Sequence, residues 1–366
     1  MGLHRESSLS KLPPFEAEIR RRLWWQIMIL DDRSATLLGV HVGAAFDTSW
    51  DTKRPLNVSD NDLSPLMQDL PKEREGPTER LFCTIRSEVG ECMRQLQVTG
   101  QDPKRDHFTC VAQKIDLVDD REMKLDKSIL KQLDSSIPLH LFSLYMARSA
   151  FLQMRLSACH PQQDPFKGAS LLQEARDKLF DWALQIIAYD SLTYLNKSLQ
   201  GYLWHVAMHF PFEAFILALT ELLARTKGEE VERAWSRINQ AYEDHPEFIA
   251  KAPRNVLYFA LGNLTLKAWD QRMLALHGDQ QFSYQPIVPT PISKLQAQRM
   301  SKVLRHEAAL QSDLSIVGTQ QVGESASSHA QPEQGSFASW NGEPGQLLQT
   351  ETCEIDWDYW NDLLHH

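Results

Sequence analysis

The sequence has few cysteines, and none of them are spaced as a metal-binding pair. Five cysteines stand at positions 83, 92, 110, 159 and 353, and no two of them form a CxxC motif. An odd, scattered set of this kind indicates neither a disulfide framework nor a zinc site. We therefore expect free thiols in a protein of a reducing compartment, with no structural metal in this chain.

The sequence motifs of common enzyme classes are also missing. There is no GxGxxG, no GxxxxGK[ST] and no GxSxG. His205 and His209 are one helical turn apart, with Glu213 one turn further on, a spacing that could hold a metal. The zincin pattern requires Glu directly after the first His, where Val206 stands. We favour a packed histidine pair and a protein that is not an enzyme, with a helical enzyme using this face as an alternative.

No segment is both long and free of polar groups. Residues 1–11 lack an apolar core, so we expect no signal peptide and a disordered start. The most apolar stretch, 203–224, is interrupted by two histidines, a proline and a glutamate. It is typical of a buried helix and not of a membrane span, so no membrane partner is expected.

Basic residues are absent from the end of the chain. No Lys or Arg follows Arg305, whereas residues 306–366 carry ten of the 48 carboxylates. The remainder of the chain then balances 38 acidic against 38 basic residues, so the tail holds the whole net charge of −10. This asymmetry is typical of an acidic interaction tail, and a neutral body is a poor non-specific binder of nucleic acid.

Apolar residues recur with helical spacing through most of the chain. Phe15, Ile19, Leu23, Ile27 and Leu30 define one apolar stripe, and no segment alternates in the manner of a strand. The sequence predicts an all-α, multi-helix regulatory domain over 12–277, followed by a disordered acidic tail. The expected helices cover about 15–32, 81–96, 139–156, 171–187, 202–225, 231–242 and 255–276. A long ordered loop is expected over 39–77, and 100–134 is ambiguous.

Beyond the body, two further segments differ in composition. Residues 278–350 form a polar linker, rich in Gln, Ser and Gly over 311–350, which we expect to be largely disordered. Residues 351–366 combine acids with large apolar side chains, which are Ile355, Trp357, Tyr359, Trp360 and Leu363. This segment could dock on the transcription machinery or a co-activator, or fold back as a last helix of the body; both interpretations stay open.

The run Arg20-Arg21-Arg22 also has two interpretations. It could contact nucleic acid or serve nuclear import, but acids flank it in the first helix. Glu16 and Arg20, and likewise Glu18 and Arg22, are oppositely charged and four residues apart. A structural role is therefore favoured over direct contact with DNA.

Two segments near the start resemble one known family. The segment 18–39 resembles the hallmark of the fungal-specific transcription factor domain, the middle homology region of binuclear zinc-cluster regulators. The loop that follows is similar to the family's loop. The matching residues are Glu18, Arg20, Arg21, Arg22, Trp24, Trp25, Asp32, Ser34 and Gly39, then Pro55, Asn57, Asp60, Asp62 and Leu63. Segments 201–222, 231–246, 261–272 and 356–364 look like later parts of the same group.

The resemblance implies a nuclear transcription regulator that acts through protein contacts, with control of a biosynthetic gene cluster as a candidate role. The six clustered cysteines of the family's DNA-binding head do not occur in this sequence. Zinc and DNA binding are therefore expected only in a head outside it. A homo- or heterodimer with a zinc-cluster regulator and a small-molecule effector are candidate partners. The alternative is a truncated fragment that titrates a full-length paralogue.

Overall fold

The protein is helical, as the computed structural model shows over residues 2–9, 11–38, 50–99, 107–159, 173–277 and 287–301. These described residues contain no strand, which confirms the all-α prediction. The α-helices are α1 (Glu6–Leu9), α2 (Pro14–Leu38), α4 (Leu81–Thr99), α5 (His107–Ser128), α6 (Pro138–Ala158), α7 (Gln173–Leu195), α8 (Leu203–Met208), α9 (Phe212–Ala224), α10 (Glu229–Asp244), α11 (Glu247–Ala250) and α12 (Val256–His277). Short 3₁₀ turns are η1 (Asp60–Asp62), η2 (Leu130–Gln132), η4 (Lys197–Tyr202) and η5 (Ala252–Arg254).

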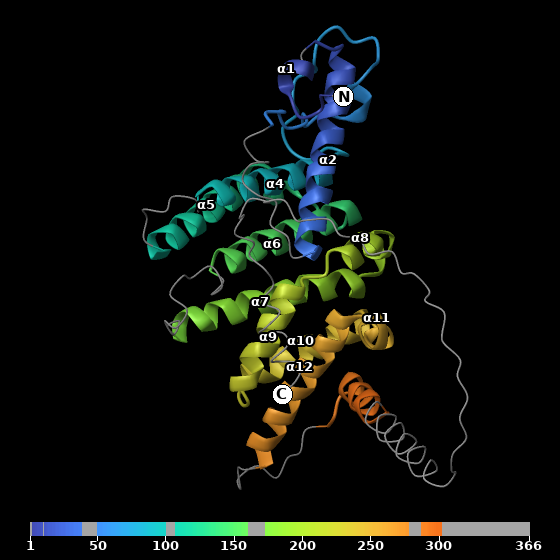
Figure 1. The fold of residues 1–366 in the computed structure, drawn as a ribbon. Coiled ribbons are helices and arrows are strands. Elements are labelled where there is room, and N and C mark those ends of the chain that lie inside the picture. The colour runs from blue at the N-terminus through green and yellow to red at the C-terminus, as the bar shows by residue number, and fades with distance from the viewer. Residues whose placement is uncertain are drawn as a thin grey trace, which may run out of the picture.

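The helices stack as successive layers (Figure 1). The pair α4 and α5 packs on α6, α6 packs on α7, and α7 packs on α9 and α10. Helix α12 closes the far end against α9. Helix α2 is different, because its N-terminal half projects from the top of the stack together with α1 (Figure 1).

The largest apolar core lies among α7, α9, α10 and α12. On α10, Val231, Trp235, Ile238 and Tyr242 recur at three- and four-residue intervals, and all four are buried. That spacing places them on one face of the helix, so α10 is anchored by its apolar stripe. A second core joins α4, α5 and α6 around Phe151.

The core extends past the boundary that composition predicts at residue 277. Residues 290–301 are helical, and Ile292 and Leu295 are buried in the core with α12. Gly262 permits this contact, because a Cβ there would lie only 3.0 Å from a methyl carbon of Leu295. The predicted linker over 278–350 therefore includes a helix here, whose three buried residues, Pro291, Ile292 and Leu295, are too few to give a strong periodic signal.

Two other predictions of secondary structure differ from the structure. The start, expected to be disordered, forms the short helix α1, because Glu6 pairs with Arg21 of α2. The predicted single helix over 202–225 is divided into α8 and α9, since Pro211 between them has no amide hydrogen to continue the ladder. The ambiguous stretch 100–134 contains α5.

None of the described helices is, on its own, long and apolar enough to cross a membrane. One pair, Lys197–Met208 with Phe212–Ala224, meets the length and composition requirement together, but with a bend of 80°. In this structure Val206 and Phe215 of that pair, and Phe210 at the break between its helices, are buried.

The tail lies outside the described residues. This applies to Ile355, Trp357, Tyr359, Trp360 and Leu363, and also to Gly39 of the first family segment.

The four described cysteines, Cys83, Cys92, Cys110 and Cys159, are free.

We expect the core of the lower layers to dominate stability. Leu222 on α9 is fully buried, whereas Leu274 on α12 is 67% exposed. Leu222→Ala should lower the free energy of unfolding by about 2–5 kcal/mol through lost transfer energy and a cavity. The matched control Leu274→Ala should change it by less than about 0.5 kcal/mol. Urea unfolding followed by circular dichroism measures both, and equal effects would contradict this placement of the core.

Candidate functional site

A buried carboxylate joins α2 to the loop of residues 51–80. Glu18 is fully buried, and its Oε1 accepts hydrogen bonds from Arg22 Nε at 3.1 Å and from Arg80 Nη1 at 3.1 Å. The backbone N–H of Leu56 donates to the same oxygen at 3.2 Å. We call Glu18, Arg22, Arg80 and the Leu56 backbone the charge clamp. It holds one helix, one loop and the start of α4 at a single point.

The second cation of the charge clamp is a buried guanidinium, whose pKa is shifted by burial and by its charged neighbours. Burial, and then the positive charge of Arg22, lowers the pKa of Arg80, while Glu18 acts in the opposite direction. Arg80 also donates to the carbonyl oxygen of Leu56. A buried guanidinium needs such partners because desolvation of a lone ion is costly.

Each arginine of the run has an acidic partner. Arg20 pairs with Glu16 at 2.6 Å, and Arg21 pairs closely with Glu6 of α1. Arg22 reaches across to Asp60 of the loop at 2.9 Å. Both pairs expected from the spacing, Glu16–Arg20 and Glu18–Arg22, are therefore present, and the run is engaged within the protein.

The loop is held in shape by its own side chains. Asn57 Nδ2 donates to the carbonyls of Arg74 and Gly76, both at 2.9 Å, and its Oδ1 accepts from Thr78. Asp62 receives two hydrogen bonds from Arg74, at 2.6 and 2.7 Å, and this contact is the main cause of the lowered pKa of Asp62. These bonds satisfy backbone and polar groups that a long loop would otherwise leave unpaired.

A tryptophan group lies beside the charge clamp. Trp24 and Trp25 are buried, and the ring of Trp50 meets their edges at centroid distances of 6.0 and 5.5 Å. Trp25 Nε1 donates to the carbonyl oxygen of Lys53 at 3.0 Å. Within this group, the guanidinium of Arg94 lies over the ring of Trp50, 5.5 Å from its centroid.

Many residues around the charge clamp belong to the two family-like segments of the sequence, but not all. The residues singled out in the sequence that the structure brings together are Glu18, Arg20, Arg21, Arg22, Trp24, Trp25, Pro55, Asn57, Asp60 and Asp62. Asp32 lies on α2, and nothing is described of its side chain. Glu6, Trp50, Arg74 and Arg80 were missed, because each lies far along the chain from its partner and belongs to no local pattern.

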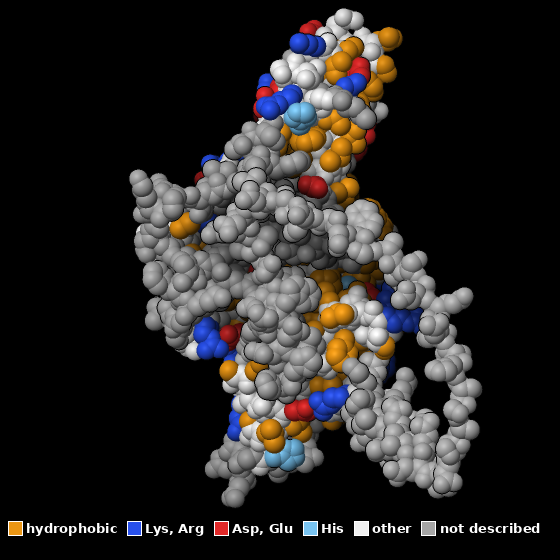
Figure 2. Space-filling view, in the orientation of Figure 1, with side chains coloured by type: hydrophobic (Ala, Val, Ile, Leu, Met, Phe, Trp, Pro, Cys, Tyr) orange, Lys and Arg blue, Asp and Glu red, His pale blue; other side chains and the backbone are white. Residues whose placement is uncertain are grey.

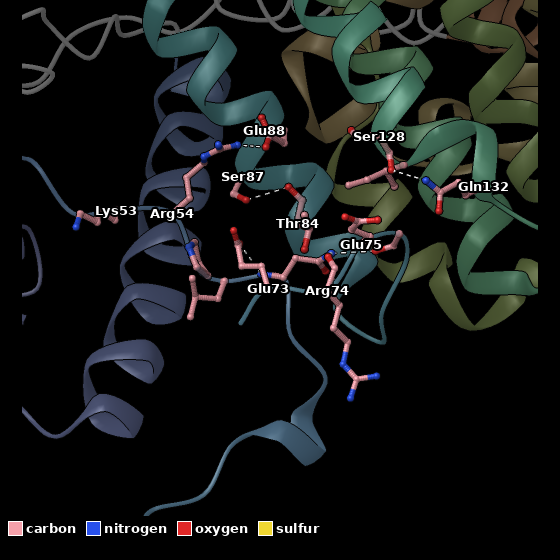
Figure 3. Close-up of a pocket in the computed structure, with 15 residues that line it drawn as sticks. Lys53, Arg54, Glu73, Arg74, Glu75, Thr84, Ser87, Glu88, Ser128 and Gln132 are labelled. Atoms are coloured by element: carbon pink, nitrogen blue, oxygen red, sulfur yellow. Dashed lines mark hydrogen bonds and ion pairs between the residues drawn. The ribbon is translucent and has the colours of Figure 1, made fainter. Parts of the chain in front are cut away.

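A polar cleft opens between the loop and α4 (Figure 3). Its volume is about 720 Å³, within the usual range for small-molecule sites. Arg54 and Glu88 form an ion pair on one side of it, while the Arg74 side chain points away from it (Figure 3). Its wall carries both cations and carboxylates, including Lys53 and Glu73.

The histidine pair packs as two stacked rings in this structure. The rings of His205 and His209 stack with centroids 4.1 Å apart, and His209 Nδ1 lies 2.8 Å from the carbonyl oxygen of His205. Glu213 instead accepts from Ser157 at 3.3 Å. In the part of the chain that the structure describes, no group of three or more His, Cys, Asp or Glu side chains could hold a metal ion.

Burial keeps the first of these histidines neutral. Burial, followed by the nearby charges of His209, Arg86 and Arg33, lowers the pKa of His205 from 6.5 to about 3. Its ring packs edge-on against Phe82 and Phe142 at 5.2 and 5.9 Å. The arrangement is that of an aromatic core residue.

The charge clamp should be a strong determinant of stability. Glu18→Gln keeps the shape but leaves Arg22 and Arg80 without their shared anion, which should cost about 3–5 kcal/mol. Glu16→Gln is the matched control, because Glu16 is half-exposed and its pair with Arg20 contributes about 0–1 kcal/mol. Urea unfolding followed by tryptophan fluorescence measures both. A Glu18→Gln protein as stable as the control would show that the clamp is dispensable.

His205 should make the protein sensitive to acid. Its pKa is about 3 when folded and near 6.5 when unfolded, so the unfolded chain binds more protons between these values. The neutral ring therefore contributes stability that declines as the pH falls below about 6.5. His205→Phe, which keeps an aromatic ring against Phe82 and Phe142, should flatten this decline in a series of thermal melts. The exposed His277→Phe serves as control, and an equal flattening in both would refute the assignment.

Comparison with known proteins agrees with this geometry. Residues 1–86, which include the charge clamp and its loop, match the fungal specific transcription factor domain. The chain is 43% identical over 273 residues to the aurofusarin cluster transcription factor aurR2 of Gibberella zeae, covering 75% of this chain and 41% of that protein. No solved structure matches the chain.

More distant relatives carry similar names. The pyriculol/pyriculariol biosynthesis cluster transcription factor 1 of Pyricularia oryzae is 28% identical over 74% of this chain and 37% of its own length. The C6 finger domain transcription factor hasF of Aspergillus fumigatus is 25% identical over 65% of this chain and 37% of its own length. The chain thus spans about two fifths of the length of these curated relatives. The matches confirm the resemblance found in the sequence: residues 1–86 match the fungal specific transcription factor domain family, and similarity to cluster transcription factors extends over three quarters of the chain.

Proposed function

We propose that the chain regulates transcription of a fungal biosynthetic gene cluster, as a regulator of the zinc-cluster type. The observation that carries the proposal is the 43% identity to a cluster transcription factor, which extends over 75% of this chain. The aligned length is far greater than the segment that holds the charge clamp, so helices of the body are included. The nucleus is the compartment in which such a regulator works.

The body contributes protein contacts and not DNA recognition in this proposal. Its charges balance, and Arg20, Arg21 and Arg22 each have an acidic partner. Phosphate affinity requires several cations that are available to the nucleic acid. We therefore assign DNA contact to a zinc-cluster head of the regulator type and assign regulation to this chain.

The cleft beside the charge clamp is the place that we propose for a small-molecule effector. Its volume of about 720 Å³ is sufficient, and its wall combines cations with carboxylates. An effector there would be polar, because apolar ligands favour pockets lined by hydrophobic side chains. Binding would act on the loop of residues 51–80, and through Leu56 on the charge clamp.

The acidic tail is proposed as the segment that contacts the transcription machinery or a co-activator. Residues 306–366 carry ten carboxylates and no Lys or Arg, a charge pattern typical of an interaction tail. Trp357, Tyr359 and Trp360 supply aromatic surface, and aromatic anchors dominate the energy of protein interfaces.

Fusion to a foreign DNA-binding domain tests this function. Both the full chain and residues 306–366 alone should raise transcription of a reporter gene in a fungal host. Combined replacement of Trp357, Tyr359 and Trp360 by Ala should abolish activation, because it removes the docking surface. Trp340→Ala, in the polar linker of the same tail, is the matched control and should retain activity.

Two results would contradict these proposals separately. If the triple-alanine fusion activates as well as the original, aromatic docking is wrong while the regulatory function stands. If neither fusion changes reporter transcription in either direction, the proposed function of the chain is itself wrong.

A further inference from the structure

The outward face of α2 carries an apolar stripe that no described element covers. Ile19, Leu23, Ile27 and Leu30 are 39%, 49%, 41% and 52% exposed. Their spacing of four, four and three residues places them within about 80° of arc on the helix. Figure 2 shows hydrophobic side chains along the upper projection, where α2 lies in Figure 1.

The opposite side of α2 is already occupied. Glu18 and Trp25 are buried against the loop of residues 51–80. Arg21 is buried against Glu6 of α1, and Trp24 is buried against Trp50. Helix α2 packs against α1 and α4 only over a limited length. The stripe is therefore not used by the described fold, although solvent-exposed apolar side chains in a continuous row are typical of an interaction surface.

The charges beside the stripe are arranged for self-association. Arg20 and the exposed Asp31 flank it on the same side of the helix, at about 60° and 80° from Leu23. They lie at nearly equal distances from the point midway between Leu23 and Ile27. When two helices pack antiparallel through their apolar stripes, residues on the same flank of each stripe lie opposite each other. Arg20 of each copy would then lie opposite Asp31 of the other copy. In a parallel pair, Arg20 of one copy and Asp31 of the other would lie on opposite sides of the interface and would not meet.

We propose that α2 is a homodimer interface, in which the stripe pairs antiparallel with the same stripe of a second copy of this chain. The two-fold axis passes between Leu23 and Ile27. Ile19 of one copy packs beside Leu30 of the other, and Leu23 beside Ile27. Each Arg20 keeps its intrahelical partner Glu16 and also faces Asp31 of the other copy. This inference is independent of the proposed regulatory function.

The end of α2 that meets the stack is fixed by contacts of its own. Arg33 donates to the carbonyl oxygens of Met208 and Phe210, at 3.0 and 3.4 Å, which fixes the C-terminal part of α2 beside α8. The Met208 side chain is itself 47% exposed. An isologous interface needs a rigidly held patch, and these contacts together with the charge clamp hold α2 at two points.

Sedimentation velocity of the full 366-residue chain across a concentration series tests the proposal. The wild-type chain should dimerise. Asp31→Arg should weaken dimerisation at least tenfold, because it places two arginines opposite each other at both ends of the interface. The double variant Arg20→Glu with Asp31→Arg should restore association toward the wild-type value, because opposite charges would again face each other at both ends. Circular dichroism and thermal melting confirm that these surface variants remain folded.

Three outcomes would overturn the proposal. A wild-type chain that is monomeric at every soluble concentration means that another occupant, such as a helix of a longer zinc-cluster regulator, covers the stripe. A dimer unaffected by both Asp31→Arg and Leu23→Glu uses a different surface. A charge-swapped double variant that stays as weak as Asp31→Arg contradicts the antiparallel register.

Discussion

The carboxylate of Glu18 is the constraint on which the upper part of the molecule depends. It is fully buried and is surrounded by two guanidinium groups and a backbone amide. A charge in that position is tolerable only when its lone pairs have donors, so the loop and the start of α4 must come to it. Satisfying this group ties α2 to the loop of residues 51–80 and to the start of α4, and the cleft lies beside that junction.

Helix α2 consequently has two chemically different sides. The inner side carries the charged and aromatic residues, Glu18 and Trp25 among them, while the outer side carries Leu23 and Ile27. This reverses the usual amphipathic order, in which the apolar stripe faces the core. The reversal is tolerated because the inner charged groups are paired with one another, and it makes the outer side available to a partner.

The lower helices and the tail differ in composition. The helices from α7 to α12 form an ordinary apolar core, while His205 stacks on His209 and packs against Phe82 of α4 and Phe142 of α6. The tail of residues 306–366 has the composition of a contact segment, with acids and aromatics but no bases. A stable helical body joined to such a segment suits a regulator whose output depends on what the tail touches.

Periodicity and composition alone were enough to establish the helical class, most helix positions, and the neutral body with its acidic tail. Each of these is a local property, set by which residues recur every three or four positions. The pairs Glu16–Arg20 and Glu18–Arg22 were predictable for the same reason. Only the tertiary structure decided that Glu18 is shared with Arg80, 62 residues away, that Leu295 packs on Gly262, and that the stripe of Leu23 faces outward. Burial depends on which distant segments arrive at a face, and no local pattern contains that information.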